Sequence, residues 1–235
     1  MTDQAVRNPI ILALDVDEAS KAFHLIHTIG NRVGFYKVGS ELFTRCGPAV
    51  VEKILNQGAS VFLDLKFYDI PNTVAKSVTS ACAMGVDMLT IHTSGGRRMM
   101  EAAIQAAQAS EASQPLILGV TVLTSFAPDE LSETGMDSDI SSQVLRLGKL
   151  AVDSGLTGLV CSPQEITLLR ASLPSETHLV TPGIRPANAS SDDQKRIMTP
   201  RDAIKAGADY LVIGRPIYSA DDPALAAEQI LASIQ

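Results

Sequence analysis

Three charged side chains lie close together in one short segment of the chain, D-L-K-F-Y-D-I-P-N-T, residues 64–73. Asp64 and Lys66 are two residues apart, so on a β-strand both side chains point to the same side. Asp69 follows three residues later, beyond the expected end of the strand. Carboxylates favour the charged form of a neighbouring ammonium group, and a cation held away from water can stabilise a carbanion and then donate a proton to it. Lys66 is therefore the candidate catalytic group.

The residues around this segment add to the cluster. Pro71 restricts Ile70 to an extended conformation and stops the strand, and Thr73 is the expected N-cap of the next helix. Lys37, from the preceding strand, supplies a second ammonium group, so four charges of alternating sign are expected at the same open end of the sheet. Carboxylates beside the lysines also repel a substrate carboxylate, whose loss as CO2 would relieve the repulsion, but we give this effect less weight than carbanion stabilisation. The alternative, a structural salt-bridge network, would not need two lysines and two aspartates on adjacent strand ends.

A second candidate site lies near the end of the chain. T-P-G-I-R-P, residues 181–186, and I-G-R-P, residues 213–216, each close an apolar strand. In a (β/α)8 barrel the loops after the seventh and eighth strands usually hold a phosphate group. Gly183 and Gly214 allow the backbone to approach a ligand closely, and Arg215 is the best candidate for binding a dianion.

Weaker candidates surround these two groups. A long polar stretch, residues 186–200, follows Arg185 and is typical of a lid; the alternative is a disordered insertion. His92 ends a strand and could orient a carboxylate, although a supporting structural role is favoured. Residues 94–96, S-G-G, could hold an anion but are better interpreted as a turn.

The elements that must position these residues alternate regularly along the chain. Longer stretches with apolar residues three and four apart separate eight short apolar, β-branched runs, and several of the longer stretches end in Gly. Eight such units predict an α/β fold, a single (β/α)8 TIM barrel that occupies residues 1–235 as one domain. The alternative, an open doubly wound sheet, is disfavoured because no dinucleotide-binding fingerprint follows the first strand. The expected strands are residues 10–16, 33–39, 60–67, 88–93, 116–123, 158–162, 178–184 and 209–215.

Polar side chains gather at the carboxyl ends of these strands. In a barrel all the carboxyl ends converge on one face, where active sites form. Strand ends that merely met water would be polar at both ends, whereas the starts of these strands are mostly apolar or small. The polar residues at or after the strand ends are Asp15, Lys37, Asp64, Lys66, His92, Thr124, Arg185 and Arg215.

Composition limits the class of protein. Of the 235 residues 46% are hydrophobic, enough for a large core, and the formal net charge of -7 makes a nucleic-acid partner unlikely. The three Cys are widely spaced with no C-x-x-C, which argues against a disulfide framework or a structural zinc site. The sequence shows no secretory signal and no apolar run long enough to span a membrane, so a reducing cytoplasm is the expected location.

The segment from Asp64 to Thr73 resembles the signature of the orotidine 5′-phosphate decarboxylase family, of the bacterial type, whose core is D-x-K-x-x-D-I-P-N-T. The resemblance extends over nearly the whole chain. ILALDVD, YKVG, LTIHTSGG, GVTVLTS, TPGIRP and VIGRPI are similar to the family's first, second, fourth, fifth, seventh and eighth strands. This resemblance implies a lyase that decarboxylates orotidine 5′-monophosphate to UMP and CO2, the last step of de novo pyrimidine nucleotide biosynthesis, with no metal and no organic cofactor.

The resemblance also implies catalytic roles for four charged residues. Lys66 would protonate C6 of the pyrimidine, Asp64 would flank it, and Lys37 would connect Asp64 to the ribose hydroxyls. Asp69 and Thr73 would reach into the site of the other subunit of a homodimer.

Further residues would bind the substrate. Asp15 would bind a ribose hydroxyl, and Thr124, with Ser125, would meet the pyrimidine. The phosphate and the lid would be held by Arg185, Gln194, Gly214 and Arg215.

Two other functions are compatible with such a chain. A related barrel decarboxylase acts on a keto-sugar phosphate with Mg2+, but it would carry an acidic residue for the metal near the second strand, where this chain has Lys37. A non-catalytic nucleotide sensor on a decayed barrel would usually have lost part of the charge cluster, which is intact here.

Overall fold

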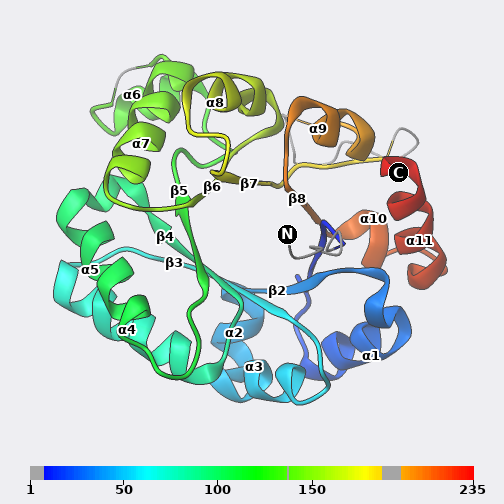
Figure 1. Cartoon of the computed structure of the whole chain (residues 1–235). Coiled ribbons are helices and arrows are strands. Elements are labelled where there is room, and N and C mark those ends of the chain that lie inside the picture. The colour runs from blue at the N-terminus through cyan, green and yellow to red at the C-terminus, as the bar shows by residue number, and fades with distance from the viewer. Residues whose placement is uncertain (1–7, 137, 187–196) are drawn as a thin grey trace, which may run out of the picture.

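The computed structural model describes residues 8–136, 138–186 and 197–235. Eight parallel strands pair in chain order and close into one barrel, with the eighth strand beside the first (Figure 1). The predicted (β/α)8 barrel is therefore confirmed. The strands are β1 (Ile10–Ala13), β2 (Phe35–Gly39), β3 (Val61–Phe67), β4 (Met88–His92), β5 (Leu116–Val120), β6 (Gly158–Val160), β7 (His178–Thr181) and β8 (Tyr210–Ile213).

Helices form the outer ring of the barrel and cover its apolar exterior (Figure 1). They are α1 (Ala19–Ile29), α2 (Ser40–Cys46), α3 (Pro48–Leu55), α4 (Pro71–Met84), α5 (Arg97–Gln108), α6 (Pro128–Glu133), α7 (Ile140–Asp153), α8 (Ile166–Ser172), α9 (Pro200–Ala206), α10 (Arg215–Tyr218) and α11 (Pro223–Ile234). Short 3-10 helices span Gly30–Arg32 (η1), Thr93–Gly95 (η2) and Pro163–Glu165 (η3). None of the helices in the described ranges is both long and apolar enough to cross a membrane.

Alternation along the strands decides which side chains face the barrel axis. Phe35 of β2 and Phe62 of β3 belong to an inner apolar cluster, so the residues two positions further along each strand, Lys37 and Asp64, also face inward. Leu63 faces the helices instead, as expected. The inner cluster consists of Ile11, Ala13, Phe35, Phe62, Met88, Leu118, Val180 and Val212. It lies below Lys37 and Asp64 and closes the barrel interior beneath them.

Several strands end earlier than the sequence predicts. β1 ends at Ala13 where the apolar run continues to Val16, and β5 ends at Val120 where the run continues to Leu123. After β1, Leu14 and Val16 are apolar because they pack in or against the core. After β5, Val122 and Leu123 are apolar because they line a cavity at the mouth of the barrel. Apolar residues therefore continue past the last residue that pairs with a neighbouring strand. For this reason an apolar run alone does not show where a strand ends.

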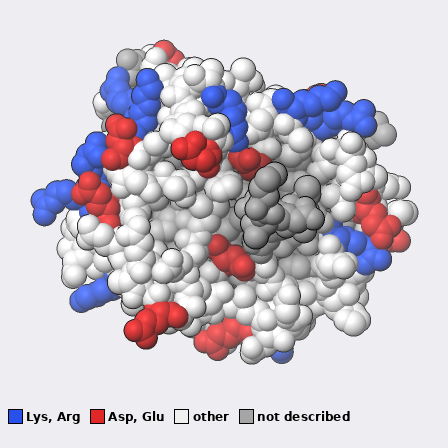
Figure 2. Space-filling model, viewed as in Figure 1, with Lys and Arg blue, Asp and Glu red and all other residues white. Residues whose placement is uncertain are grey.

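Two carboxylates accept hydrogen bonds from backbone N–H groups at the starts of β3 and β7. Asp87 accepts a hydrogen bond from the backbone N–H of Val61 at 2.8 Å, and Asp209 accepts one from Leu179 N–H at 2.7 Å and pairs with Arg170. Figure 2 shows the face where the strands begin, with acidic side chains around its centre and most basic ones toward its edge. At the opposite end, residues of both signs line a cavity: Asp15, Asp64, Lys37, Lys66, Arg185 and Arg215.

The start of α4 differs in detail from the prediction. Ile70 has the extended conformation that Pro71 imposes (φ -59°, ψ 152°), but Ile70 is the N-cap and Pro71 is the first helical residue. Thr73 lies in the first turn of the helix, so its prediction as N-cap was wrong. Proline is well suited to the first helical position because its missing N–H has no partner there in any case.

Candidate active site

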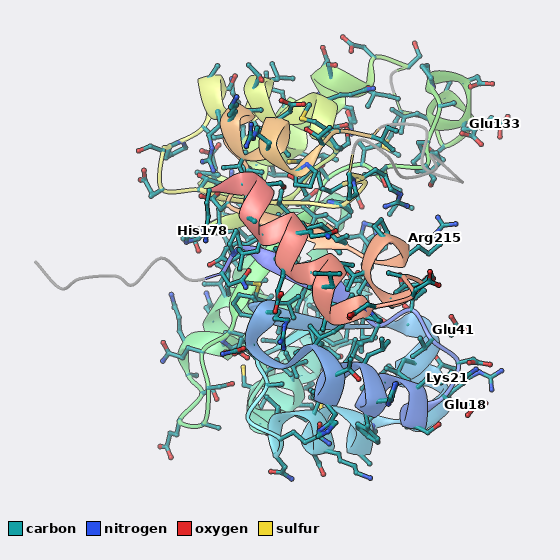
Figure 3. All side chains as sticks on the ribbon, turned by 90° about the vertical axis from the view of Figure 1, so that its right-hand side faces the viewer. Glu18, Lys21, Glu41, Glu133, His178 and Arg215 are labelled. Atoms are coloured by element: carbon teal, nitrogen blue, oxygen red, sulfur yellow. The ribbon has the colours of Figure 1, made fainter. Side chains whose placement is uncertain are left out.

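A cavity of about 270 Å³ opens at the carboxyl ends of the strands. In Figure 3 Arg215, which begins α10, lies at this end of the barrel, and His178, which begins β7, lies at the other. Apolar residues of the inner cluster, such as Phe62 and Val212, form the bottom of the cavity, and charged residues line it above them. A ligand would therefore contact both ionic and apolar groups. Eight of the residues predicted for the site line it: Asp15, Lys37, Asp64, Lys66, Thr124, Arg185, Gly214 and Arg215.

Four of these residues form a continuous charge network. The Lys66 Nζ lies 2.9 Å from Asp64 Oδ1, and the Lys37 Nζ lies 3.5 Å from Asp64 Oδ2. Lys37 also donates to Asp15 Oδ1 at 3.1 Å. We call Asp15, Lys37, Asp64 and Lys66 the charge network. It joins β3 to β2 and to the loop after β1, and it places two ammonium groups on opposite sides of one largely buried carboxylate.

Burial and charge act in opposite directions on the two central groups. Burial alone would lower the pKa of Lys37, but Asp64 and Asp15 outweigh it and raise the pKa above its usual value. Burial alone would raise the pKa of Asp64, but Lys37, Lys66 and the hydrogen bonds from Lys66 and Thr90 hold it below its usual value. Both groups are therefore charged at neutral pH.

The missing side chain of Gly39 makes room for this arrangement. Gly39 pairs with Asp64 across β2 and β3, and a Cβ atom at Gly39 would lie 3.0 Å from Lys37 Nζ and 3.5 Å from Asp15 Oδ1. A side chain there would push against the ammonium group of Lys37. Gly39 thus allows Lys37 to turn from its own strand toward Asp15.

Lys66 has an unusual backbone conformation. Its φ is +50°, the one positive value outside glycine among the described residues, and the pairing of β3 with β4 shifts register between Leu63 and Phe67. The bulge takes the Lys66 N–H out of the strand pairing and toward the Thr90 hydroxyl, which accepts it at 2.9 Å. As predicted, the side chains of Asp64 and Lys66 lie on the same side of β3, where both line the cavity. A bulge separates them, however, in place of the regular strand that the prediction assumed.

The loops after β7 and β8 form the other wall of the cavity. Arg185 is buried, its N–H donates to Met198 O at 3.0 Å, and its Nη1 donates to Ile184 O at 3.0 Å. A Cβ atom at Gly214 would lie 3.3 Å from Tyr218 Cε1, so the backbone there is close to an aromatic wall. Arg185 and Arg215 bring two guanidinium groups to the lining of one cavity.

Three predicted residues lie outside this lining. Asp69 is exposed, and its Oδ1 accepts a hydrogen bond from Ile70 N–H at 2.6 Å. Thr73 is exposed on α4, and Ser125 is exposed beside Thr124 in a neighbouring hollow. Gln194, like residues 187–196 of the expected lid, lies outside the described residues.

His92 is beside the network without joining the cavity lining. Its ring centroid lies 5.5 Å from that of Tyr68. Burial first, and the positive charge of Lys66 second, lower the pKa of His92, so the imidazole is neutral at pH 7. Within the described ranges, no three His, Cys, Asp or Glu side chains are grouped closely enough to hold a metal ion.

Sequence reasoning missed two residues of the site. Thr90 of β4 is buried and contacts both Asp64 and Lys66, and Tyr218 lines the cavity three residues after Arg215. The available signals were weak: a single hydroxyl in an otherwise apolar strand, and an aromatic residue one helical turn from the candidate phosphate ligand.

Comparison with known proteins gives consistent matches. A family described as Orotidine 5′-phosphate decarboxylase / HUMPS matches residues 8–230. An orotidine 5′-phosphate decarboxylase of Opitutus terrae is 51% identical over 226 residues, 96% of this chain and 98% of that protein. One from Pseudomonas aeruginosa (strain LESB58) is 50% identical over 230 residues, 98% of this chain and 99% of that protein. The crystal structure of orotidine 5′-phosphate decarboxylase from Lactobacillus acidophilus has a TM-score of 0.87 at 37% identity, covering 97% of this chain and 99% of that one.

The ion pairs of Asp64 with Lys66 and with the buried Lys37 predict a pH-dependent stability for Asp64→Asn. Removing the charge leaves Lys37 buried with one carboxylate partner fewer, so the free energy of unfolding should fall by about 3 kcal/mol at pH 7. Since the pKa of Asp64 is lowered by folding, its contribution is complete above the unfolded pKa of about 3.9 and is lost as the pH falls below it. The difference between wild type and variant, measured by urea unfolding, should be constant from about pH 7 to pH 5 and shrink below about pH 4.

The control is Asp17→Asn, which removes an exposed partner of Lys21 and should change stability little at any pH. A difference between wild type and Asp64→Asn that stays the same from pH 7 to pH 3 would contradict the assignment of the lowered pKa to Asp64.

Proposed function

The chain belongs to the orotidine 5′-phosphate decarboxylase / HUMPS family, and from that membership we propose how its cavity converts orotidine 5′-monophosphate to UMP and CO2. It is a carboxy-lyase. The observation that supports the mechanism is the position of the Lys66 ammonium group, which lies 2.9 Å from the largely buried Asp64 carboxylate. The Lys66 side chain is still 36% exposed and lines the cavity. A substrate in the cavity can reach Lys66, which is more exposed than Lys37 and Asp64.

In the proposed reaction the bond between C6 and the carboxyl carbon breaks and CO2 leaves. The electron pair stays on C6, where Lys66 Nζ stabilises it and then donates a proton. The charge network supports this by fixing the ammonium group before the substrate arrives, so little reorganisation is needed as the negative charge develops. Repulsion between Asp64 and the substrate carboxylate contributes less.

The rest of the cavity supports a nucleotide in one orientation. Lys37 and Asp15, joined at 3.1 Å, would bind the ribose hydroxyls between the reacting base and the phosphate. Thr124, with Ser125, would meet the pyrimidine from the loop after β5. At the far end the guanidinium groups of Arg185 and Arg215 and the backbone of Gly214 would hold the phosphate. Gln194, of the lid expected from the sequence, would complete the group.

Asp69 and Thr73 are proposed to serve the neighbouring subunit of a homodimer. Asp69 is exposed and outside the cavity of its own chain. The residues on either side of it, Tyr68 and Ile70, are 61% and 65% exposed, which is unusual for large apolar side chains and typical of an interface. A two-fold axis would then give each site one Asp69 and one Thr73 from the partner.

The first prediction about the reaction tests the role of Lys66. Lys66→Ala should lower kcat at least about a thousandfold while the protein stays folded, because it removes a transition-state interaction and a proton donor. The measurement is the loss of the orotate absorbance band with orotidine 5′-monophosphate in EDTA. Lys205→Ala, an exposed lysine on α9, is the control and should leave kcat unchanged.

Activity of Lys66→Ala within about tenfold of wild type, a barrier change of about 1.4 kcal/mol, would overturn the mechanism. Wild-type turnover that requires Mg2+ and stops in EDTA would favour the keto-sugar phosphate alternative, and binding without turnover would favour a nucleotide sensor.

The second prediction concerns the phosphate. Arg215→Ala should weaken UMP binding by about 10- to 100-fold and uridine binding far less, because only the nucleotide offers a dianion to the guanidinium. Calorimetry with both ligands measures the difference, and Arg201→Ala, on the surface of α9, is the matched control. Equal losses for UMP and uridine would refute the assignment.

The third prediction tests the shared site. When Lys66→Ala and Asp69→Ala proteins exchange subunits, each mixed dimer has one site lacking both groups and one intact site. Activity should rise toward about half the wild-type value per mixed dimer if the sites are independent. The absorbance assay measures the recovery, and mass spectrometry verifies the exchange.

The control for that experiment mixes wild type with a chain carrying both substitutions. If Asp69 serves the partner's site, each site of this mixed dimer lacks one group, so mixed dimers should be inactive. Activity retained on exchange in the control, with no recovery in the first mixture, would place Asp69 in the site of its own subunit.

A further inference from the structure

The Thr90 hydroxyl on β4 joins the backbone of one reacting residue to the side chain of another. Thr90 Oγ1 accepts a hydrogen bond from the Lys66 N–H at 2.9 Å and donates one to Asp64 Oδ1 at 3.0 Å. The residue is 1% exposed and lies outside the cavity lining. Thr90 therefore cannot touch the substrate in this arrangement and can act only through Lys66 and Asp64.

The first hydrogen bond answers a need created by the backbone. Lys66 has a φ of +50°, a conformation that costs energy for a residue with a Cβ atom and persists only where its surroundings hold it. The register shift between Leu63 and Phe67 leaves its N–H without the usual strand partner. A backbone N–H that is shielded from water needs an acceptor, and Thr90 Oγ1 supplies one to this partly buried group from the neighbouring strand.

The second hydrogen bond orients the carboxylate. Asp64 Oδ1 accepts from both Lys66 Nζ and Thr90 Oγ1, which leaves Oδ2 facing Lys37 Nζ at 3.5 Å. A hydroxyl has one proton to donate, so accepting from Lys66 N–H and donating to Asp64 uses Thr90 in a single orientation. The same group thereby fixes the bulge and assigns one carboxylate oxygen to each lysine.

We infer that Thr90 is a positioning residue for decarboxylation, which holds the strained Lys66 backbone and the Asp64 carboxylate in the geometry that aims the Lys66 ammonium group at the substrate. The inference rests on the proposed function of Lys66. A displacement of about 1 Å at a catalytic group can lower a rate by about a hundredfold, so the loss of this hydroxyl should appear in kcat. Substrate binding through the ribose and phosphate groups should be largely unchanged.

The test compares Thr90→Ser with Thr90→Ala. Both substitutions remove the same methyl group, so their difference isolates the hydroxyl. Thr90→Ser should keep kcat within about threefold of wild type, and Thr90→Ala should lower it roughly 10- to 100-fold, with KM for orotidine 5′-monophosphate and Kd for UMP within about threefold in both. Thr90→Val, which keeps the shape without the hydroxyl, should resemble Thr90→Ala.

Thr93→Val is the matched control. Thr93 is also a buried threonine, and its hydroxyl donates to Val120 O at 2.9 Å, outside the charge network. Thermal unfolding should show lower stability for Thr93→Val and for Thr90→Val, but only Thr90→Val should lose kcat.

Three results would overturn the inference: equal kcat for Thr90→Ser and Thr90→Ala, a loss confined to KM, or an equal kcat loss in Thr93→Val. Should Thr90→Val fail to fold, the Ser and Ala pair still decides the question. Lys66→Ala separates this failure from that of the mechanism. A large loss in Lys66→Ala with no effect of the Thr90 hydroxyl removes only the positioning role, whereas an active Lys66→Ala removes the mechanism itself.

Discussion

The Asp64 carboxylate, with only 13% of its side chain exposed, has to be compensated by groups within reach of its own two oxygens. Lys66 and Lys37 approach it from opposite sides. Lys37 is itself buried and in turn takes a second partner, Asp15, in the space that Gly39 leaves open. The largely buried charge of Asp64 on β3 thus requires Lys37 on β2 and Lys66 on β3, and Lys37 in turn requires Asp15 after β1. The contacts that offset the cost of removing these charges from water also hold the active groups in place.

The fold could be predicted from the sequence because its signals are local and repeated. Eight apolar runs separated by helical spacing are typical of one parallel barrel, and alternation along β2 and β3 suffices to turn Lys37 and Asp64 inward above Phe35 and Phe62. The ends of the strands could not be predicted as well. Val122 is buried in the cavity lining rather than in the sheet, and an apolar residue looks the same in either place.

Much of the candidate site could also be predicted, because the carboxyl ends of parallel strands must meet on one face. Strand order alone therefore places Asp64, Lys37, Arg185 and Arg215 together. Thr90 could not be predicted in the same way, because the alternation of side chains holds only in a regular strand and the bulge before Phe67 interrupts it. Nor can one chain place the Asp69 side chain in a site, since Asp69 is exposed and the cavity that it is proposed to complete belongs to another subunit.

In the proposed dimer, β3 and the turn that follows it therefore supply residues to two active sites. The strand presents Lys66 to the cavity of its own chain, and three residues later it sends Asp69 outward. Because Pro71 starts α4 at once, the chain between these groups has little freedom to absorb a displacement. A shift of the strand end would move both groups together and so disturb two sites. A hydrogen bond from β4 at the bulge, where Thr90 meets Lys66, stabilises the strand at the point from which both groups are aimed.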